Sequence, residues 1–134
     1  MEQNKQVALE LSRAIMKGDW AQVDALLDDS FTYVGDARPA MNKAQYVGFM
    51  RNVLCAAMHD MDMVFTRVVA EGDLVAVEYT NAMTHAGAFF GHPPTGKRVM
   101  GTGHFMRQVK DGKVTGEWQT TNMAGLMAQL GAAS

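Results

Sequence analysis

The sequence lacks the features that would support a disulfide framework, a nucleic-acid surface or a membrane span. Its 134 residues contain a single cysteine, Cys55, so no internal disulfide can form. Lysine and arginine number 12 against 14 acidic residues, a balance that supplies no basic surface for a nucleic-acid backbone. No apolar run approaches the roughly 18 residues of a spanning helix, and charges interrupt residues 1–20, where a signal peptide would lie. We expect one soluble, cytoplasmic domain over residues 1–134, without nucleic-acid or membrane partners.

Methionine, by contrast, is abundant. The chain has 12 methionines, more than its two Trp, three Tyr and six Phe together. Hydrophobic residues make up 48% of the chain, which is enough to bury one sizeable core. Methionine is flexible and fills irregular apolar space. Two interpretations therefore stay open, an adaptable cavity and a soft core.

The first half of the chain shows helical periodicity. Apolar residues four positions apart predict a first helix that ends at Gly18, and Asp19 then caps a short second helix. A third helix is predicted to begin at Asn42, where Gln45 completes a capping box, and to run about four turns to Met58. Between the second and third helices, residues 31–35 alternate as a short strand.

From residue 61 onward the period changes to two. The alternation predicts antiparallel strands separated by turns at residues 71–73 and 110–112, and a short helix near the end of the chain. The predicted strands cover residues 61–70, 74–85, 98–109 and 113–121. Three helices followed by long strands indicate an α+β fold, with the helices on one face of a curved antiparallel sheet.

The last hairpin suggests a binding face. A three-residue turn with Gly112 in the left-handed conformation pairs His104 with Trp118, whereas a two-residue turn would pair His104 with Gln119. With the three-residue turn, one sheet face mixes apolar and polar side chains, as a ligand pocket does. The candidate substrate-binding residues on this face are Gln108, Trp118, Thr120 and Asn122. Arg107 and Glu117 are then expected to form an ion pair on the opposite face.

His104 is the candidate catalytic residue because it is the only histidine in the middle of a predicted strand. A neutral imidazole can act as a general acid or base near neutral pH. The alternative is a half-buried structural histidine that is hydrogen-bonded to Trp118 or Thr102. The four histidines show no metal-ligand spacing, so we expect no metal.

Two further residues, Tyr33 and Met50, are expected in the pocket. A tyrosine on a buried strand needs a polar partner for its hydroxyl. Met50 lies on the core stripe of the third helix, and Met100 and Met106 are predicted on the sheet face opposite that stripe. Asp29 and Asp36 flank the short strand and could bring a carboxylate to the pocket mouth, although such aspartates more often cap turns.

Four segments resemble the SnoaL-like polyketide cyclase family in order and spacing. They are residues 84–99 (THAGAFFGHPPTGKRV), 70–80 (AEGDLVAVEYT), 111–118 (DGKVTGEW) and 125–131 (GLMAQLG), about half of the chain. The resemblance implies a cone-shaped α+β barrel of the nuclear-transport-factor-two-like, cystatin-like type. It also implies a deep pocket, a homodimer formed through the outer sheet face, and acid/base chemistry without metal or cofactor.

The family's catalytic aspartate and its assisting histidine are both replaced. The aspartate position, four residues after Trp118, is Asn122, and the histidine position is Gln108. Amides do not exchange protons near neutral pH, so the cyclase mechanism does not transfer intact. The sequence thus predicts a protein that binds a hydrophobic, oxygenated small molecule. It leaves open whether the pocket catalyses a cyclase, isomerase or hydrolase reaction, only binds, or is collapsed in a domain that acts through dimer contacts.

Overall fold

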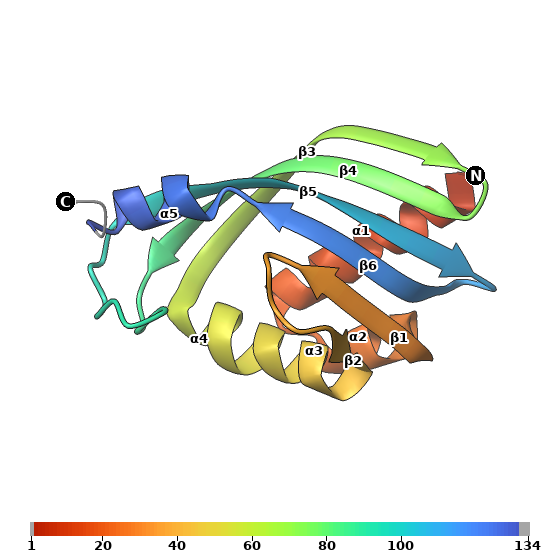
Figure 1. Ribbon diagram of the computed structural model, residues 1–134, viewed down its shortest axis with the longest axis horizontal. Helices are drawn as coiled ribbons and strands as arrows, with labels where there is room; N and C mark the ends of the chain where they lie inside the picture. Colours follow the sequence, from red (N-terminus) through yellow and green to blue (C-terminus); the bar gives the residue numbers. More distant parts are fainter. Residues whose placement is uncertain (1, 132–134) are drawn as a thin grey trace.

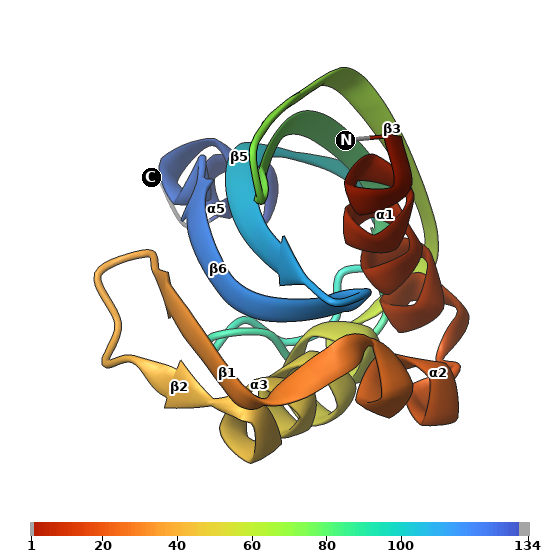
Figure 2. The ribbon, with the colours of Figure 1, turned by 90° about the vertical axis from the view of Figure 1, so that its right-hand side faces the viewer.

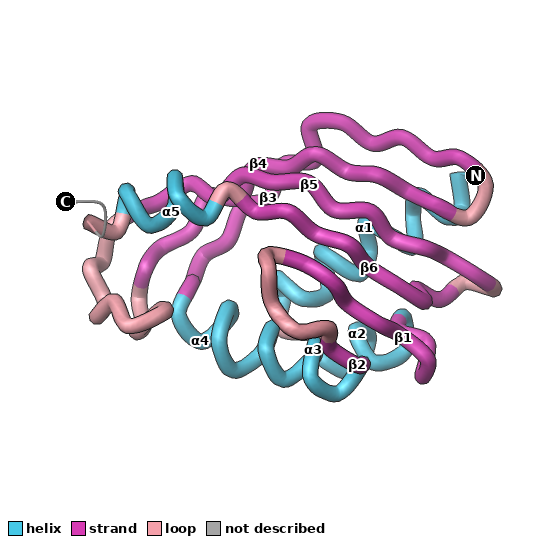
Figure 3. The backbone as a smooth tube through the Cα atoms, viewed as in Figure 1, coloured by secondary structure: helices cyan, strands magenta, loops and turns pink. Residues whose placement is uncertain are grey.

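A six-stranded sheet with the strand order β2-β1-β6-β5-β4-β3 dominates the structure, a computed structural model that describes residues 2–131 (Figures 1 and 3). Neighbouring strands are antiparallel except β1 and β6, which are parallel. The strands are β1 (Leu27–Gly35), β2 (Met41–Asn42), β3 (Met58–Glu71), β4 (Leu74–His85), β5 (Arg98–Lys110) and β6 (Lys113–Thr121).

The predicted helices are present and begin at the predicted caps. Gln22 N donates to Asp19 Oδ1 over 3.2 Å, and Asn42 and Gln45 form the full capping box. Between residues 2 and 131, none of the helices has the length and apolar character needed to cross a membrane. The helices are α1 (Glu2–Lys17), α2 (Trp20–Leu26), α3 (Lys43–Phe49), the π-helical turn η1 (Met50–Leu54), α4 (Cys55–Ala57) and α5 (Met123–Gln129).

The sheet curves around the helices (Figure 2). On β4 and β5 nearly every second residue is buried, which marks one face as the concave interior. The main core lies between this face, α1 and α3, with Leu11, Tyr46 and Phe105 among its buried residues. A second, smaller core joins Met83 on β4 to Leu126 on α5. The α+β architecture predicted from the sequence is confirmed.

The turn between β5 and β6 differs from the prediction. Lys110 pairs with Lys113, so the turn has two residues rather than three. Asp111 and Gly112 both have positive φ, at 51° and 76°. Two left-handed residues match the natural twist of a tight hairpin. The prediction of a three-residue turn was wrong because it placed only Gly112 in the left-handed conformation, whereas Asp111 adopts it too.

A bulge then shifts the register once more. Thr115 is the extra residue, after which His104 pairs with Thr120 instead of Trp118. His104, Trp118 and Thr120 still share a face, as predicted, and all three side chains are exposed. That face is therefore the outer one, and the prediction that it lines the interior was wrong.

The methionine placement was correct for Met50 and wrong for the sheet. Met50 is buried against the main core, whereas Met58, predicted on the same helix, begins β3 and is buried against the second core. Met100 and Met106 are 44% and 40% exposed, on the outer face of β5. They do not face Met50.

Candidate functional site

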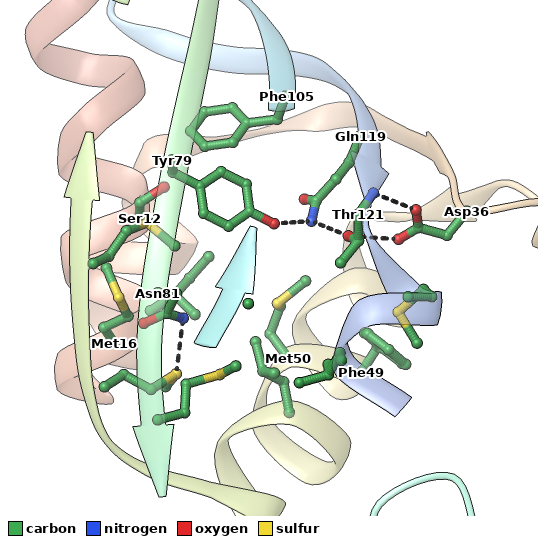
Figure 4. Close-up of a pocket in the computed structure, with 18 of the residues that line it drawn as sticks. Ser12, Met16, Asp36, Phe49, Met50, Tyr79, Asn81, Phe105, Gln119 and Thr121 are labelled. Atoms are coloured by element: carbon green, nitrogen blue, oxygen red, sulfur yellow. Dashed lines mark hydrogen bonds between the residues drawn. The ribbon is translucent and has the colours of Figure 1, made fainter. Parts of the chain in front are cut away.

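A cavity of about 120 Å³ lies between the concave face of the sheet, α1, and the consecutive helices α3 and η1 (Figure 4). Half of the chain's methionines line it, from four different elements and the start of a fifth. We call these six the cavity methionines: Met16, Met50, Met61, Met63, Met83 and Met123. Flexible thioether side chains give the cavity walls that can adapt to a ligand. Four of them, Met50, Met61, Met63 and Met83, also pack in or against the two cores, so these residues serve both the core and the cavity wall.

One wall of the cavity carries a chain of hydrogen bonds (Figure 4). Gln119 Nε2 donates to the Tyr79 hydroxyl over 3.0 Å and to Thr121 Oγ1 over 2.9 Å. Thr121 Oγ1 in turn donates to Asp36 Oδ2 over 3.0 Å, and Thr121 N donates to Asp36 Oδ1 over 2.8 Å. Both protons of the Gln119 amide are engaged, and none of residues 2–131 donates a hydrogen bond to its carbonyl oxygen, which can therefore accept one from a ligand.

Tyr79 is a hydrogen-bond donor for a ligand. Its oxygen accepts from Gln119, which leaves the hydroxyl proton to be donated. Burial raises the pKa of Tyr79 above its usual value, so the hydroxyl keeps this proton at neutral pH. Tyr33 also lines the cavity, and within residues 2–131 its hydroxyl has no hydrogen-bond partner. Burial first, and then the charge of Glu117, raise the pKa of Tyr33 strongly.

A buried ion pair supports one side of the cavity. Arg107 Nε lies 2.6 Å from Glu117 Oε1, and the two residues are 3% and 1% exposed. Tyr46 donates to the same carboxylate oxygen over 3.0 Å, and Arg107 donates to Ser12 Oγ over 2.8 Å. Arg107, Tyr46 and Ser12 line the cavity. The predicted ion pair exists, but its predicted position on the outer surface was wrong.

The turn between β1 and β2 brings two charged residues to the cavity. Asp36 and Ala37 both have positive φ, at 52° and 57°, and Arg38 N donates to Gly35 O over 3.1 Å. This tight turn places Asp36 and Arg38 on the cavity lining. Left-handed backbone at an alanine is uncommon and costs about 1–2 kcal/mol. Such strain is typical of functional sites.

The predicted site residues divide between two places. Tyr33 and Met50 lie on the cavity lining. His104, Trp118 and Thr120 line a more open hollow on the outer face. The His104 side chain is 69% exposed, and its Nε2 lies 3.4 Å from Glu78 Oε2.

The two amides of the family pattern also lie off the cavity lining. Gln108 donates to Asp73 Oδ2 over 3.2 Å and accepts from Thr115 Oγ1 over 2.9 Å. Asn122 caps α5 by accepting from Gly125 N over 3.0 Å. Both side chains hold the local backbone and neighbouring strands in place. The expected pocket contacts of Gln108 and Asn122 were wrong. Gln108 lies on the outer face of β5, and Asn122 caps the first turn of α5.

Sequence analysis missed Tyr79, Gln119 and Thr121. The alternation along β4 could have found Tyr79, because it continues the buried series of Val75 and Val77. Gln119 and Thr121 could be assigned to the inner face only if Trp118 and Thr120, which alternate with them on β6, were known to face outward. Among residues 2–131, no cluster of three or more His, Cys, Asp or Glu side chains is arranged to hold a metal ion.

The comparisons with known proteins agree on one family. The family model for the SnoaL-like polyketide cyclases matches residues 5–130. AclR from Streptomyces galilaeus, a proposed hydroxylase, is 28% identical, with a TM-score of 0.89 over 100% of this chain and 99% of that one. IdmH from Streptomyces antibioticus, a proposed polyketide cyclase, is 26% identical, with a TM-score of 0.84 over 96% and 98%.

A more distant structure extends the comparison. A proposed SnoaL-like polyketide cyclase from Jannaschia sp. CCS1 is 23% identical over 99% of this chain and 94% of that chain, with a TM-score of 0.88. At this identity the likeness shows the fold, and it confirms the predicted cone of helices and curved sheet. None of the curated proteins matches the chain. The family match over nearly the whole length shows that the chain belongs to the SnoaL-like polyketide cyclase family.

Proposed function

We propose that the inner cavity binds a small, apolar molecule with a carbonyl group and catalyses proton transfer next to that carbonyl, without a cofactor. The observation that carries this proposal is the chain of hydrogen bonds from Tyr79 through Gln119 and Thr121 to Asp36 on the wall of a methionine-lined cavity. A few oriented polar groups in an apolar cavity are typical of small-molecule sites.

Each polar group has a role in this proposal. Tyr79 donates a hydrogen bond from its hydroxyl to the carbonyl oxygen, without transferring the proton, and stabilises the negative charge that develops there. Among residues 2–131, Asp36 is the only carboxylate on the cavity lining, so it is the candidate general base. It accepts the proton from the carbon next to the carbonyl, and the electrons of the broken C–H bond move to the oxygen, which forms an enolate. Gln119 and Thr121 position Tyr79 and Asp36.

The named relatives support this chemistry. IdmH is a proposed polyketide cyclase, and forming a ring by aldol addition begins with an enolate. The predicted base, His104, lies on the outer face, and therefore we assign the proton transfer to Asp36 instead. A module that binds without catalysis would use the same cavity, and the following experiment separates the two functions.

Exchange of protons for deuterium tests the proposal. Octan-2-one is incubated in deuterated buffer with the protein, and deuterium uptake next to its carbonyl is followed by mass spectrometry. We expect faster uptake than in buffer, and a loss of about 100-fold in Asp36→Asn and in Tyr79→Phe. Asp29→Asn is the matched control, because Asp29 is exposed and lies outside the cavity. Binding without exchange would support the binding module, and no binding would refute both.

We also propose that a second copy of the chain covers the outer sheet face. Four large apolar side chains are exposed there, at 40–64%: Val34, Val69, Met106 and Trp118. Apolar clusters of this kind on a soluble surface mark interaction sites. Light scattering after gel filtration should give a dimer, which Trp118→Lys converts to a monomer. A monomeric wild-type protein at micromolar concentration would refute the interface.

A further inference from the structure

We propose that Arg38 recognises a carboxylate, so that the ligand of the cavity is a small apolar acid. This inference rests on the proposed binding function and names the class of ligand. It is carried by a partly buried guanidinium at the cavity that contacts two aromatic rings and, among the described residues, has no hydrogen-bond acceptor or counter-charge.

The aromatic partners fix the position of Arg38. Its guanidinium carbon lies 4.5 Å from the ring centre of Phe49 and 4.5 Å from that of Phe90. The two ring centres are 6.5 Å apart. Phe49 ends α3, and Phe90 belongs to the loop that joins β4 to β5. The side chain is therefore held in place before any ligand arrives, which lowers the entropic cost of binding.

Contacts with aromatic rings accept none of the N–H donors of a guanidinium in the way that a carboxylate oxygen does. All five N–H donors of arginine lie in the plane of the group, where they match the two oxygens of a carboxylate. Within residues 2–131, the Arg38 side chain donates no hydrogen bond to protein and forms no ion pair within 4.0 Å. A partly buried charge without a counter-charge is unfavourable, and a ligand carboxylate would remove this cost.

The other charged groups on the cavity lining already have partners. Asp36, two residues before Arg38, uses both carboxylate oxygens to accept from Thr121. Arg107 is paired with Glu117 at 2.6 Å. Among the described residues, Arg38 is thus the one charged group on this lining whose side chain has neither a hydrogen-bond partner nor a counter-charge. Its sign sets the sign of the ligand's charged group.

The size and lining of the cavity describe the rest of the ligand. A volume of about 120 Å³ lies below the roughly 300–1,000 Å³ of pockets for drug-sized molecules. The surrounding side chains are mostly methionine, leucine, isoleucine and aromatic residues. The fitting ligand has a compact or narrow apolar body, with its carboxylate at Arg38 and its carbonyl at Tyr79.

A matched pair of probes tests the charge. Octanoate and octanamide have the same tail and nearly the same shape, and only octanoate is charged at pH 7. Isothermal titration calorimetry on the full chain should show octanoate binding at least about tenfold more tightly than octanamide. Arg38→Met should abolish this preference without weakening the binding of octanamide. Arg38→Lys, which keeps the charge but loses the planar fork, should retain part of it.

Arg51→Met is the matched control, because Arg51 is exposed and lies outside the cavity lining, with its guanidinium 5.9 Å from the Trp20 ring centre. It should leave both affinities unchanged. Equal binding of the two probes, or a preference for octanoate that survives Arg38→Met, would overturn the role of Arg38 and leave the cavity function standing. Binding of neither probe would overturn both proposals. Octanamide binding by Arg38→Met itself shows that the variant is folded.

Discussion

Replacing Glu117 with glutamine should lower the free energy of unfolding by about 3–5 kcal/mol. The substitution keeps the volume of the side chain but removes its charge. Arg107, which is 3% exposed, then holds a positive charge in the interior without a counter-charge. Removing one partner of a buried ion pair is costly for this reason, although the pair itself adds little net stability.

The surroundings of Arg107 set the size of the effect. A pair of unit charges about 4 Å apart is worth about 4 kcal/mol at an effective dielectric constant near 20. Arg107 keeps its hydrogen bonds to Ser12 Oγ and Ala8 O, and its guanidinium carbon stays 4.0 Å from the Phe105 ring centre. These contacts prevent a larger loss but do not neutralise the charge.

Urea unfolding followed by circular dichroism measures the change. Glu2→Gln is the matched control, because it breaks an ion pair with Lys5 in which the Glu2 side chain is 82% exposed, and it should cost less than about 1 kcal/mol. The double variant Arg107→Met/Glu117→Leu should recover most of the stability, since apolar side chains of similar volume replace the pair. A Glu117→Gln loss no larger than that of Glu2→Gln would refute the reasoning.

Two further predictions concern packing and pH. Gly103→Ala should cost about 1–3 kcal/mol, because a Cβ there would lie 2.6 Å from Thr120 O and 2.9 Å from the Tyr79 hydroxyl. Gly48→Ala, in a helix with nothing within 4 Å of the new Cβ, should instead stabilise by about 0.5–1 kcal/mol; thermal melts decide both. Stability should fall as the pH rises above about 10, because burial raises the pKa of Tyr33 and Tyr79 in the folded state while the unfolded chain ionises there. Phenolate absorbance should therefore rise only together with unfolding, and titration of both tyrosines near pH 10 in an intact fold would contradict this.

Local sequence signals were sufficient for most of the secondary structure, although the short strand β2 was not predicted. The capping residues Asp19 and Asn42 mark where two helices begin, and the alternation from residue 74 to 85 follows β4. These features depend on neighbours in the chain, so they can be recognised without the rest of the fold. The motifs of residues 84–99 then gave the family.

The inner face of the sheet was assigned to the wrong side from the sequence. On β5 the inner face carries Val99, Phe105 and Val109, but it also carries two glycines and Arg107. A charged arginine argues against a buried face, whereas Met100 and Met106 on the other face argue for one. Arg107 is buried only because Glu117 on β6 and Ser12 on α1 meet it there, and such partners are distant in sequence.

The polar end of the site was missed for the same reason. Asp36 was weighed as a carboxylate near the pocket mouth, but its link to Thr121 spans 85 positions in the sequence. A methionine wall was predicted from Met50, Met58, Met100 and Met106, and of these four only Met50 lines the cavity. Abundance of a residue type can be read from composition, whereas its placement depends on register and on a single bulge at Thr115.

The central claim is that the inner cavity, rather than the outer face, binds the ligand. Nuclear magnetic resonance of protein labelled with ¹³C at the methionine methyl groups tests it directly, with octan-2-one as the titrant. We expect the signals of the cavity methionines to shift in a saturable way, and those of Met100 and Met106 on the outer face to stay unchanged. Saturable shifts confined to Met100 and Met106, or no shift at any methionine, would contradict it.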